Sequence, residues 1–106
     1  MATNNHKKMP APQWDLRLYV AGQTARSLRT IESLQTMCET HLKGQYKIEV
    51  IDLMRNPKMA REDQILATPT LVRRLPPPLR KLIGELTNAD RVLSALGLFP
   101  RTSAAW

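Results

Sequence analysis

The sequence has little cysteine, few aromatic residues and no long apolar run, and each shortage excludes a class of protein. Cys38 is the only cysteine among 106 residues, so an internal disulfide, a dithiol redox pair and a thiolate-rich zinc site are excluded. Aromatic residues make up 5%, too few for the stacked rings that single-stranded nucleic acids require. No apolar run approaches the roughly 18 residues of a membrane span. The first residues also lack the apolar core of a signal peptide, so we expect a cytoplasmic protein.

The charge balance is basic, with 16 lysines and arginines against 9 acidic residues and a formal net charge of +7. Such a balance suits a nucleic acid, an anionic membrane surface or an acidic protein as partner. Most of the basic residues are scattered, and only Arg73, Arg74, Arg80 and Lys81 gather in a stretch without a carboxylate. A solvated surface explains this distribution best, an acidic protein partner comes second, and nucleic acid comes last.

The length suits one domain. Residues 1–13 combine polar side chains with two prolines and have little to bury, so we expect a flexible N-terminal arm there. The domain is expected over residues 14–99, followed by a flexible tail over residues 100–106.

Hydrophobic periodicity predicts a βαβ unit in the first half. Residues 16–20 alternate between apolar and polar side chains, which predicts a strand with one face in the core. Apolar residues then recur at spacings of three and four from Leu28 to Leu42, which predicts a helix capped by Ser27. The apolar run over residues 47–53 is typical of an interior strand, parallel to the first. The crossover between these strands should be right-handed.

The second half gives weaker signals. Asn56 is a candidate N-cap with Pro57 in the first helical position, and a short polar helix is expected to continue to Gln64. Residues 70–75 can form a strand. Residues 79–86 fit both a helix face and a strand face, and residues 88–99 have a helical pattern with Asn88 as a cap but could also form a strand.

Several short strings resemble the KaiB family of clock proteins in one register, from about Leu16 to Leu98. The pairing of Ala-Thr-Pro-Thr with Leu-Pro-Pro-Pro is much more specific than any single string, and the chain is identified as a divergent member of this family. The matching strings are LYVAG at 18–22, VIDL at 50–53, NP at 56–57, ILATPTL at 65–71, LPPP at 75–78 and IGEL at 83–86.

The resemblance implies a single α/β domain with a thioredoxin-like βαβαββα fold that binds the ring ATPase KaiC. It also implies an alternative ground state, βαββααβ and often tetrameric, in which the C-terminal half is rearranged. Two packings of one sequence must differ by only a few kcal/mol, and the ambiguous signals over residues 70–99 suit such a switch. The residues that the resemblance connects with switching are Pro76, Pro77, Pro78, Gly84, Ala95 and Gly97.

Ala95 stands where clock members carry a glycine, and alanine favours a helix by roughly 1 kcal/mol over glycine. The acidic tail of clock members is absent from the C-terminal residues. We therefore expect a persistently thioredoxin-like monomer, with a tetramer as the state of the other fold.

The resemblance also implies partner-binding residues. Gln64 replaces a lysine of the clock members, and Glu49 replaces a base, which weakens the expectation that KaiA is captured. A second-partner surface for KaiA is implied at Arg29, Lys47 and Glu49. The implied KaiC-facing residues are Asn56, Pro57, Lys58, Gln64, Leu66, Ala67, Thr68 and Pro69.

No motif predicts catalysis, a cofactor or a metal site. A catalytic thioredoxin carries two cysteines at the start of its first helix, where residues 22–25 here read Gly-Gln-Thr-Ala. Cys38 and His41 would supply only half of a zinc site, so Cys38 is expected in the core. Glu62 and Asp63 are most simply a hydrophilic helix surface.

The sequence thus predicts a non-enzymatic adaptor that binds a KaiC-type ring, competes with a KaiA-like protein or a SasA-type kinase, and modulates circadian or stress-timing output. One alternative is a KaiC-sensing module similar to the SasA input domain, which does not switch fold. Another, of a different class, is a basic nucleic-acid-binding protein, whose binding would weaken steeply with salt.

Overall fold

The computed structural model describes residues 13–84, 86 and 88–97. The expected arm, apart from its last residue, and the expected tail lie outside the described residues. The elements follow one another as βαβαββα, so the first of the two folds implied by the resemblance is the one observed. They are β2 (Trp14–Val20), α2 (Ala25–Leu42), β3 (Tyr46–Asp52), α3 (Pro57–Glu62), β4 (Thr70–Leu75), β5 (Arg80–Ile83) and α4 (Ala89–Leu96).

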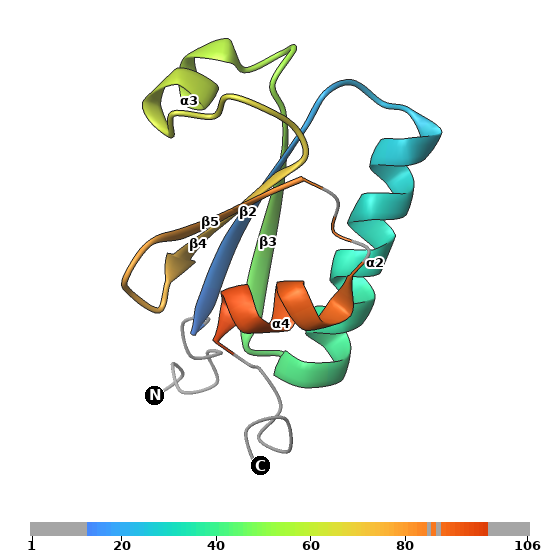
Figure 1. Cartoon of the computed structure of the whole chain (residues 1–106), viewed down its shortest axis with the longest axis vertical. Helices are drawn as coiled ribbons and strands as arrows, with labels where there is room; N and C mark the ends of the chain where they lie inside the picture. Colours follow the sequence, from blue (N-terminus) through green and yellow to red (C-terminus); the bar gives the residue numbers. More distant parts are fainter. Residues whose placement is uncertain (1–12, 85, 87, 98–106) are drawn as a thin grey trace, which may run out of the picture.

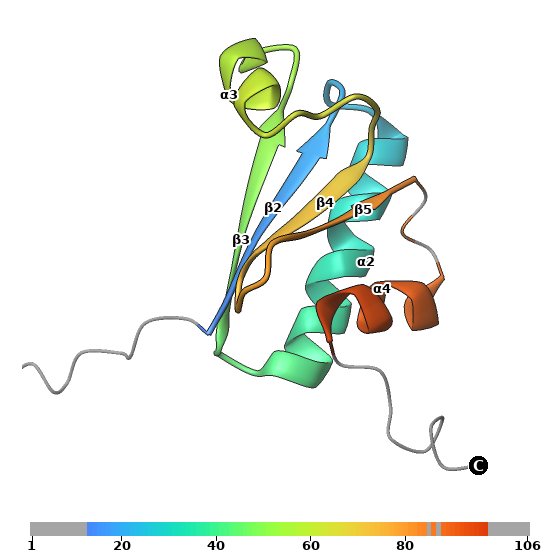
Figure 2. The ribbon, with the colours of Figure 1, turned by 60° about the vertical axis from the view of Figure 1, so that its left-hand side comes forward.

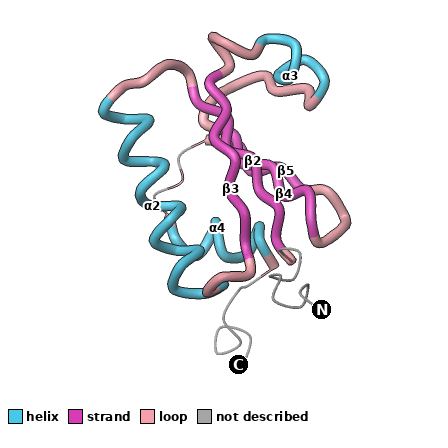
Figure 3. Tube along the Cα trace, turned by 180° about the vertical axis from the view of Figure 1, so that it is seen from behind, coloured by secondary structure: helices cyan, strands magenta, loops and turns pink. Residues whose placement is uncertain are grey.

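The strands form one four-stranded sheet in the order β3-β2-β4-β5. β2 and β3 are parallel, whereas β4 is antiparallel to both β2 and β5. Helices α2 and α4 lie on one face of the sheet, and α3 lies at one end of the other face (Figures 1 and 2). Among the described residues, the rest of that second face carries no helix, as the view from behind shows (Figure 3).

β3 is an edge strand, so the prediction of an interior strand is wrong. Ile48 packs against the core on the α2 side of the sheet, whereas Ile51 belongs to the core beneath α3. An edge strand covered by helices on both faces therefore shows the same two-sided apolar pattern as an interior strand.

The larger core lies between the sheet and the helices α2 and α4. Leu34, Cys38 and Leu42 recur along one side of α2 and are buried, which confirms the predicted helix and the core position of Cys38. The cap and the first turn differ from the prediction. Thr24 is the N-cap, its side chain accepting a hydrogen bond from the Ser27 amide at 3.0 Å.

Leu28, expected on the core side of that helix, is instead 57% exposed. The helix begins at Ala25, before Ser27, and its buried side continues through Ser27 and Thr30 in the first two turns. Leu28 therefore remains on the surface.

A smaller core lies between the sheet and α3. Tyr19, Ile51, Ala60 and Val72 are its buried members. β2 therefore has apolar contacts on both faces, and the expectation that only one face lies in the core is wrong. Tyr19 is fully buried although it occupies a position that simple alternation assigns to the outside.

Long-range packing resolves the ambiguous second half. β5 forms a hairpin with β4, and the Asn88 side chain caps α4 by accepting a hydrogen bond from the Arg91 amide at 3.1 Å. Leu86, Val92 and Leu96 complete the larger core. α4 ends at Gly97, whose φ of 80° is the left-handed conformation that glycine adopts readily.

Arg73 joins α4 to the hairpin. Its Nη1 donates to the Leu96 carbonyl at 3.1 Å and its Nη2 to the Pro78 carbonyl at 3.0 Å, while the Trp14 indole donates to the same Leu96 carbonyl at 3.1 Å. The guanidinium is buried, and its Nε has no partner among the described residues. Burial, and to a lesser extent the charge of Arg80, lower the pKa of Arg73.

Candidate protein-binding site

Residues 56–69, which we call the α3 segment, contain all the predicted KaiC-facing residues. Pro57 occupies the first turn of α3 as predicted. Asn56 is at the N-cap position, but its side chain does not cap the helix, because the amide donates to the Asp52 carbonyl at 3.1 Å. The helix ends at Glu62 rather than Gln64, whose φ of 57° lies in the left-handed region.

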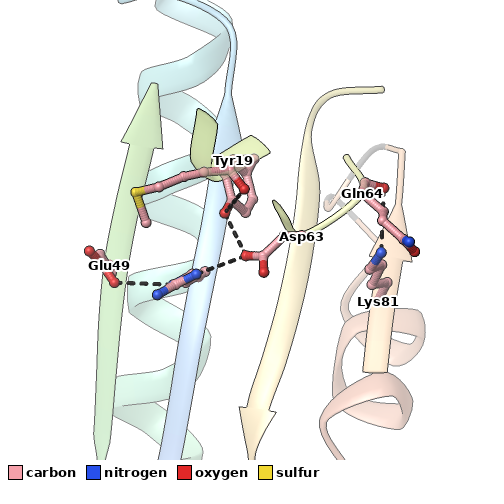
Figure 4. A network of polar contacts seen from close by, with 7 residues as sticks. Tyr19, Glu49, Asp63, Gln64 and Lys81 are labelled. Carbon is pink, nitrogen blue, oxygen red and sulfur yellow. Dashed lines mark hydrogen bonds and ion pairs between the residues drawn. The ribbon is translucent and has the colours of Figure 1, made fainter. Parts of the chain in front are cut away.

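Asp63 fastens the α3 segment to the sheet (Figure 4). Its Oδ2 accepts hydrogen bonds from the Tyr19 hydroxyl at 2.5 Å and from Arg17 Nη1 at 2.9 Å, and the second contact is also an ion pair. Arg17 Nε also contacts Glu49 at 3.3 Å. The prediction that Asp63 is a solvated part of the helix surface is therefore wrong.

The network shifts the ionisation of its members. Burial by itself would raise the pKa of Asp63, but the hydrogen bonds from Tyr19 and Arg17 and the charge of Arg17 outweigh it, so this pKa is lowered. Burial and the hydrogen bond to Asp63 raise the pKa of Tyr19 to about 12. At neutral pH the carboxylate is charged and the phenol keeps its proton, which is the pairing that the contacts require.

The α3 segment exposes most of the predicted partner-binding residues. Ile65 is partly buried against the smaller core, whereas the next residue, Leu66, is 91% exposed. Thr68 is partly exposed and Pro69 is buried. The other exposed members of the predicted set are Asn56, Pro57, Lys58, Gln64 and Ala67.

Hydrogen bonds hold the end of the α3 segment in place. The Thr70 hydroxyl donates to the Ala67 carbonyl at 2.7 Å, and the Gly84 amide donates to the Pro69 carbonyl at 2.9 Å. Lys81 Nζ lies 3.4 Å from the Gln64 carbonyl (Figure 4). Leu66 is thus presented between fixed points on α3 and β4.

A shallow cavity of about 350 Å³ adjoins Thr68 and Pro69, which are joined by a cis peptide bond. Thr24 and Ser27, at the start of α2, line its other side. No thiol lies there, because Cys38 is in the middle of α2, where burial and then the charge of Glu39 raise its pKa to about 11. Such a thiol carries no dithiol chemistry.

A metal site is not formed either in the part of the chain that the structure describes. No cluster of three His, Cys, Asp or Glu side chains is placed to hold an ion there. Cys38 is buried whereas His41 is exposed, so these two residues, three apart on α2, do not come together as ligands of one metal ion. None of the described helices is long and apolar enough to cross a bilayer.

The residues predicted for a second partner do not form one surface. Lys47 and Glu49 alternate with Ile48 along β3, so they lie on the α3 side of the sheet, and Glu49 contacts Arg17. Arg29 is exposed on α2, which covers the opposite face.

The residues connected with switching lie in the C-terminal half. Pro76, Pro77 and Pro78 form the turn between β4 and β5, and Gly84 follows β5 with a φ of 107°. Ala95 lies in the last turn of α4, and Gly97 caps it. A Cβ at Gly97 would lie 3.0 Å from Arg73 Nη1, so this capping position also adjoins the buried guanidinium.

Comparison with known proteins identifies relatives across most of the chain. A family model described as the KaiB domain matches residues 17–98. The "Circadian clock oscillator protein KaiB" of Synechococcus sp. (strain CC9311) is 49% identical over 89 residues, 84% of this chain and 75% of the relative. The protein of the same name from Picosynechococcus sp. (strain PCC 7002) is 52% identical over 83 residues, 78% of this chain and 80% of the relative.

Solved structures show the same fold at low identity. The N-terminal domain of Synechococcus elongatus SasA superposes with a TM-score of 0.68 and 20% identity, covering 85% of this chain and 89% of that domain. Chloroplastic thioredoxin z superposes with a TM-score of 0.66 and 21% identity, covering 82% of this chain and 78% of the thioredoxin. The domain is therefore thioredoxin-like.

Proposed function

Because the chain belongs to the KaiB family, we propose that it is a non-enzymatic adaptor that binds the ATPase ring of a KaiC-type protein. Relatives carry the name of circadian clock oscillator proteins, which supports a role in circadian output; a stress-timing role is the other output that we propose. One observation carries the proposal, namely that the α3 segment is anchored by Asp63 yet leaves Leu66 91% exposed.

The anchored segment has the physical properties of a docking surface. A segment whose backbone is already held between fixed points loses little backbone freedom on binding, so more of the burial free energy of its exposed apolar side chain contributes to affinity. Leu66 would serve as the apolar centre of the contact, and the exposed Asn56, Lys58 and Gln64 would form its polar rim.

In this proposal the thioredoxin-like state is the one that binds, as a monomer. A rearranged state of residues 70–99 would lower the apparent affinity in proportion to its population. The helical Ala95 and the glycine cap at Gly97 favour the binding state. A KaiA-like protein or a SasA-type kinase would compete for the ring or for the assembled complex.

A SasA-like sensing module is the second candidate, and it is favoured by the shared fold of the SasA N-terminal domain. Backbone NMR of the free and ring-bound protein tests for a fold switch. Both candidates require β5 and α4 in the complex. A second set of free-state signals for residues 70–99 would exclude the sensing module, which does not switch fold, whereas a single set agrees both with that module and with a persistently thioredoxin-like adaptor.

Substitution of Leu66 tests the proposal. We expect Leu66→Ala to weaken binding to a KaiC-type ring with ATP at least about tenfold, as truncation of a central contact does. The melting temperature should be unchanged, because the side chain makes little contact with the rest of the chain. Leu28→Ala is the matched control, since Leu28 is also exposed but lies on α2.

Biosensor titration with immobilised rings gives the affinities, and thermal melting gives the stability. Equal affinity of the Leu66 variant and the wild type would show that the α3 segment is not the contact surface. A wild-type protein that binds no KaiC-type ring would refute the function itself. Binding to DNA that weakens steeply with salt would instead favour the nucleic-acid alternative.

A further inference from the structure

The hairpin of β4 and β5 carries positive charge without compensation from its own strands. Residues 70–84 contain Arg73, Arg74, Arg80 and Lys81 but no acidic residue. Arg73 is buried, and its cross-strand partner is Arg80. Like charges directly opposite each other destabilise an antiparallel pair, so an anionic group beside Arg80 would stabilise the hairpin.

The outer edge of β5 is open in the part of the chain that the structure describes. β5 is the last strand of the sheet order. The Gly84 amide bonds to the Pro69 carbonyl, and antiparallel pairs alternate between bonded and non-bonded residues. In the observed register the backbone groups of Leu82 face β4, whereas those of Lys81 and Ile83 face outward.

Exposed apolar side chains flank the charges on this edge. Leu79 is 56% exposed and Ile83 is 51% exposed. Lys81 and Ile83 occupy alternate positions of β5, so their side chains share one face of the strand, and Leu79 directly precedes the strand. The other edge strand, β3, carries both Lys47 and Glu49 and lacks this uniform sign.

We propose that the open edge of β5 binds an extended acidic segment of a partner protein, which adds to the sheet as a fifth strand. Backbone hydrogen bonds to Lys81 and Ile83 would supply affinity, and side chains would supply specificity. Acidic residues would lie opposite Arg80 and Lys81, and apolar residues opposite Leu79 and Ile83. Residues 1–12 and 98–106 contain no aspartate or glutamate, so these residues do not supply the acidic segment.

An extended peptide is favoured over other anionic ligands by the backbone of β5. A nucleic acid or a lipid surface would use the charges of Arg80 and Lys81 but not the outward amides and carbonyls beside them. The proposal does not depend on the ring-binding function, because the peptide is tested on the isolated protein.

The probe is a labelled heptapeptide, Thr-Val-Thr-Glu-Asp-Val-Thr, which places its first valine opposite Ile83 and its glutamate opposite Lys81 in an antiparallel strand. Fluorescence anisotropy measures its binding. N-methylation of that valine and that glutamate removes the amides that face β5, and we expect binding to be lost. The control peptide is N-methylated at the second threonine and at the aspartate, whose amides face away from β5. We expect it to bind as the unmethylated peptide does.

Charge reversal on the protein gives the second readout. We expect Arg80→Glu and Lys81→Glu each to weaken peptide binding about tenfold, because two negative charges would then face each other at a close contact. Lys47→Glu on β3 is the control for the opposite edge and should bind normally. Circular dichroism verifies that each variant is folded.

Three results would overturn the proposal. They are absence of binding at about 1 mM peptide, equal loss for both N-methylated peptides, and equal loss for Lys47→Glu and Lys81→Glu. Displacement of the peptide by an oligonucleotide together with indifference to N-methylation would assign the surface to general anion binding instead. If the peptide does not bind, the result of the ring titration is unaffected, so the two proposals are tested separately.

Discussion

Replacing Asp63 by asparagine is expected to loosen α3 from the sheet. The carboxylate accepts hydrogen bonds from Tyr19 at 2.5 Å and from Arg17 at 2.9 Å, and the side chains of Asp63 and Arg17 are 19% and 18% exposed. Hydrogen bonds to a charged group contribute about 1.5–3 kcal/mol each, and a neutral amide oxygen keeps part of this. We expect the free energy of unfolding to fall by about 2 kcal/mol and the melting temperature by roughly 10 °C.

The pH dependence tests the same reasoning more sharply. Because the pKa of Asp63 is lowered in the folded chain, its contribution is complete above the unfolded value of about 4 and is lost as the pH falls through the folded pKa. Urea denaturation of the wild type and Asp63→Asn should therefore give a gap in stability that narrows progressively below about pH 4.

Two further variants complete this experiment. Glu62→Gln removes the neighbouring exposed carboxylate and should change stability by less than about 0.5 kcal/mol. Tyr19→Phe combined with Asp63→Asn should destabilise by less than the sum of the single changes, because both remove one shared hydrogen bond. A stability gap that is absent at about pH 7, or that stays constant into acid, would refute the anchoring role of Asp63.

Other substitutions test the remaining contacts. Gly97→Ala should lower stability by about 1–2 kcal/mol, since alanine is strained at a φ of 80° and its Cβ would lie 3.0 Å from Arg73 Nη1; an unchanged urea midpoint would contradict this. Trp14→Phe removes one hydrogen bond to the end of α4 and should cost about 1 kcal/mol, measured by thermal melting. The Cys38 thiol should react with a disulfide reagent at pH 8 only as fast as the native state opens, since it is buried and its pKa is raised to about 11. Leu34→Ala should cost about 2–5 kcal/mol in the same urea assay, because the side chain is fully buried.

Local sequence pattern was sufficient to predict several elements, including some whose partners lie far away in the sequence. The buried residues of α2 recur every three or four positions, and the bounds of β4, Thr70–Leu75, agree with the predicted strand. Proline and glycine at element ends also mark structure locally, as Pro57 does at α3. Such signals need no knowledge of the tertiary fold.

The α3 anchor could not be predicted in this way. Tyr19 and Asp63 are separated by 44 residues, and alternation along β2 assigns Tyr19 to the outer face. Its burial depends on where α3 packs, which no residue near Tyr19 specifies. The second half was ambiguous for the same reason. Its apolar residues fit both a helix and a strand, and only packing of residues such as Leu86 and Val92 against the distant core selects one of them.

The buried guanidinium of Arg73 has a consequence for how the molecule opens. It bonds to the Pro78 and Leu96 carbonyls, so α4 cannot leave the hairpin without breaking a charge-assisted hydrogen bond to a buried guanidinium. β4 is itself paired with β2 in the middle of the sheet, so its amide hydrogens should exchange with solvent as slowly as those of β2. The residues of α4 should therefore open together, in one step that breaks the Arg73 contact, and not by progressive fraying from the end of the helix.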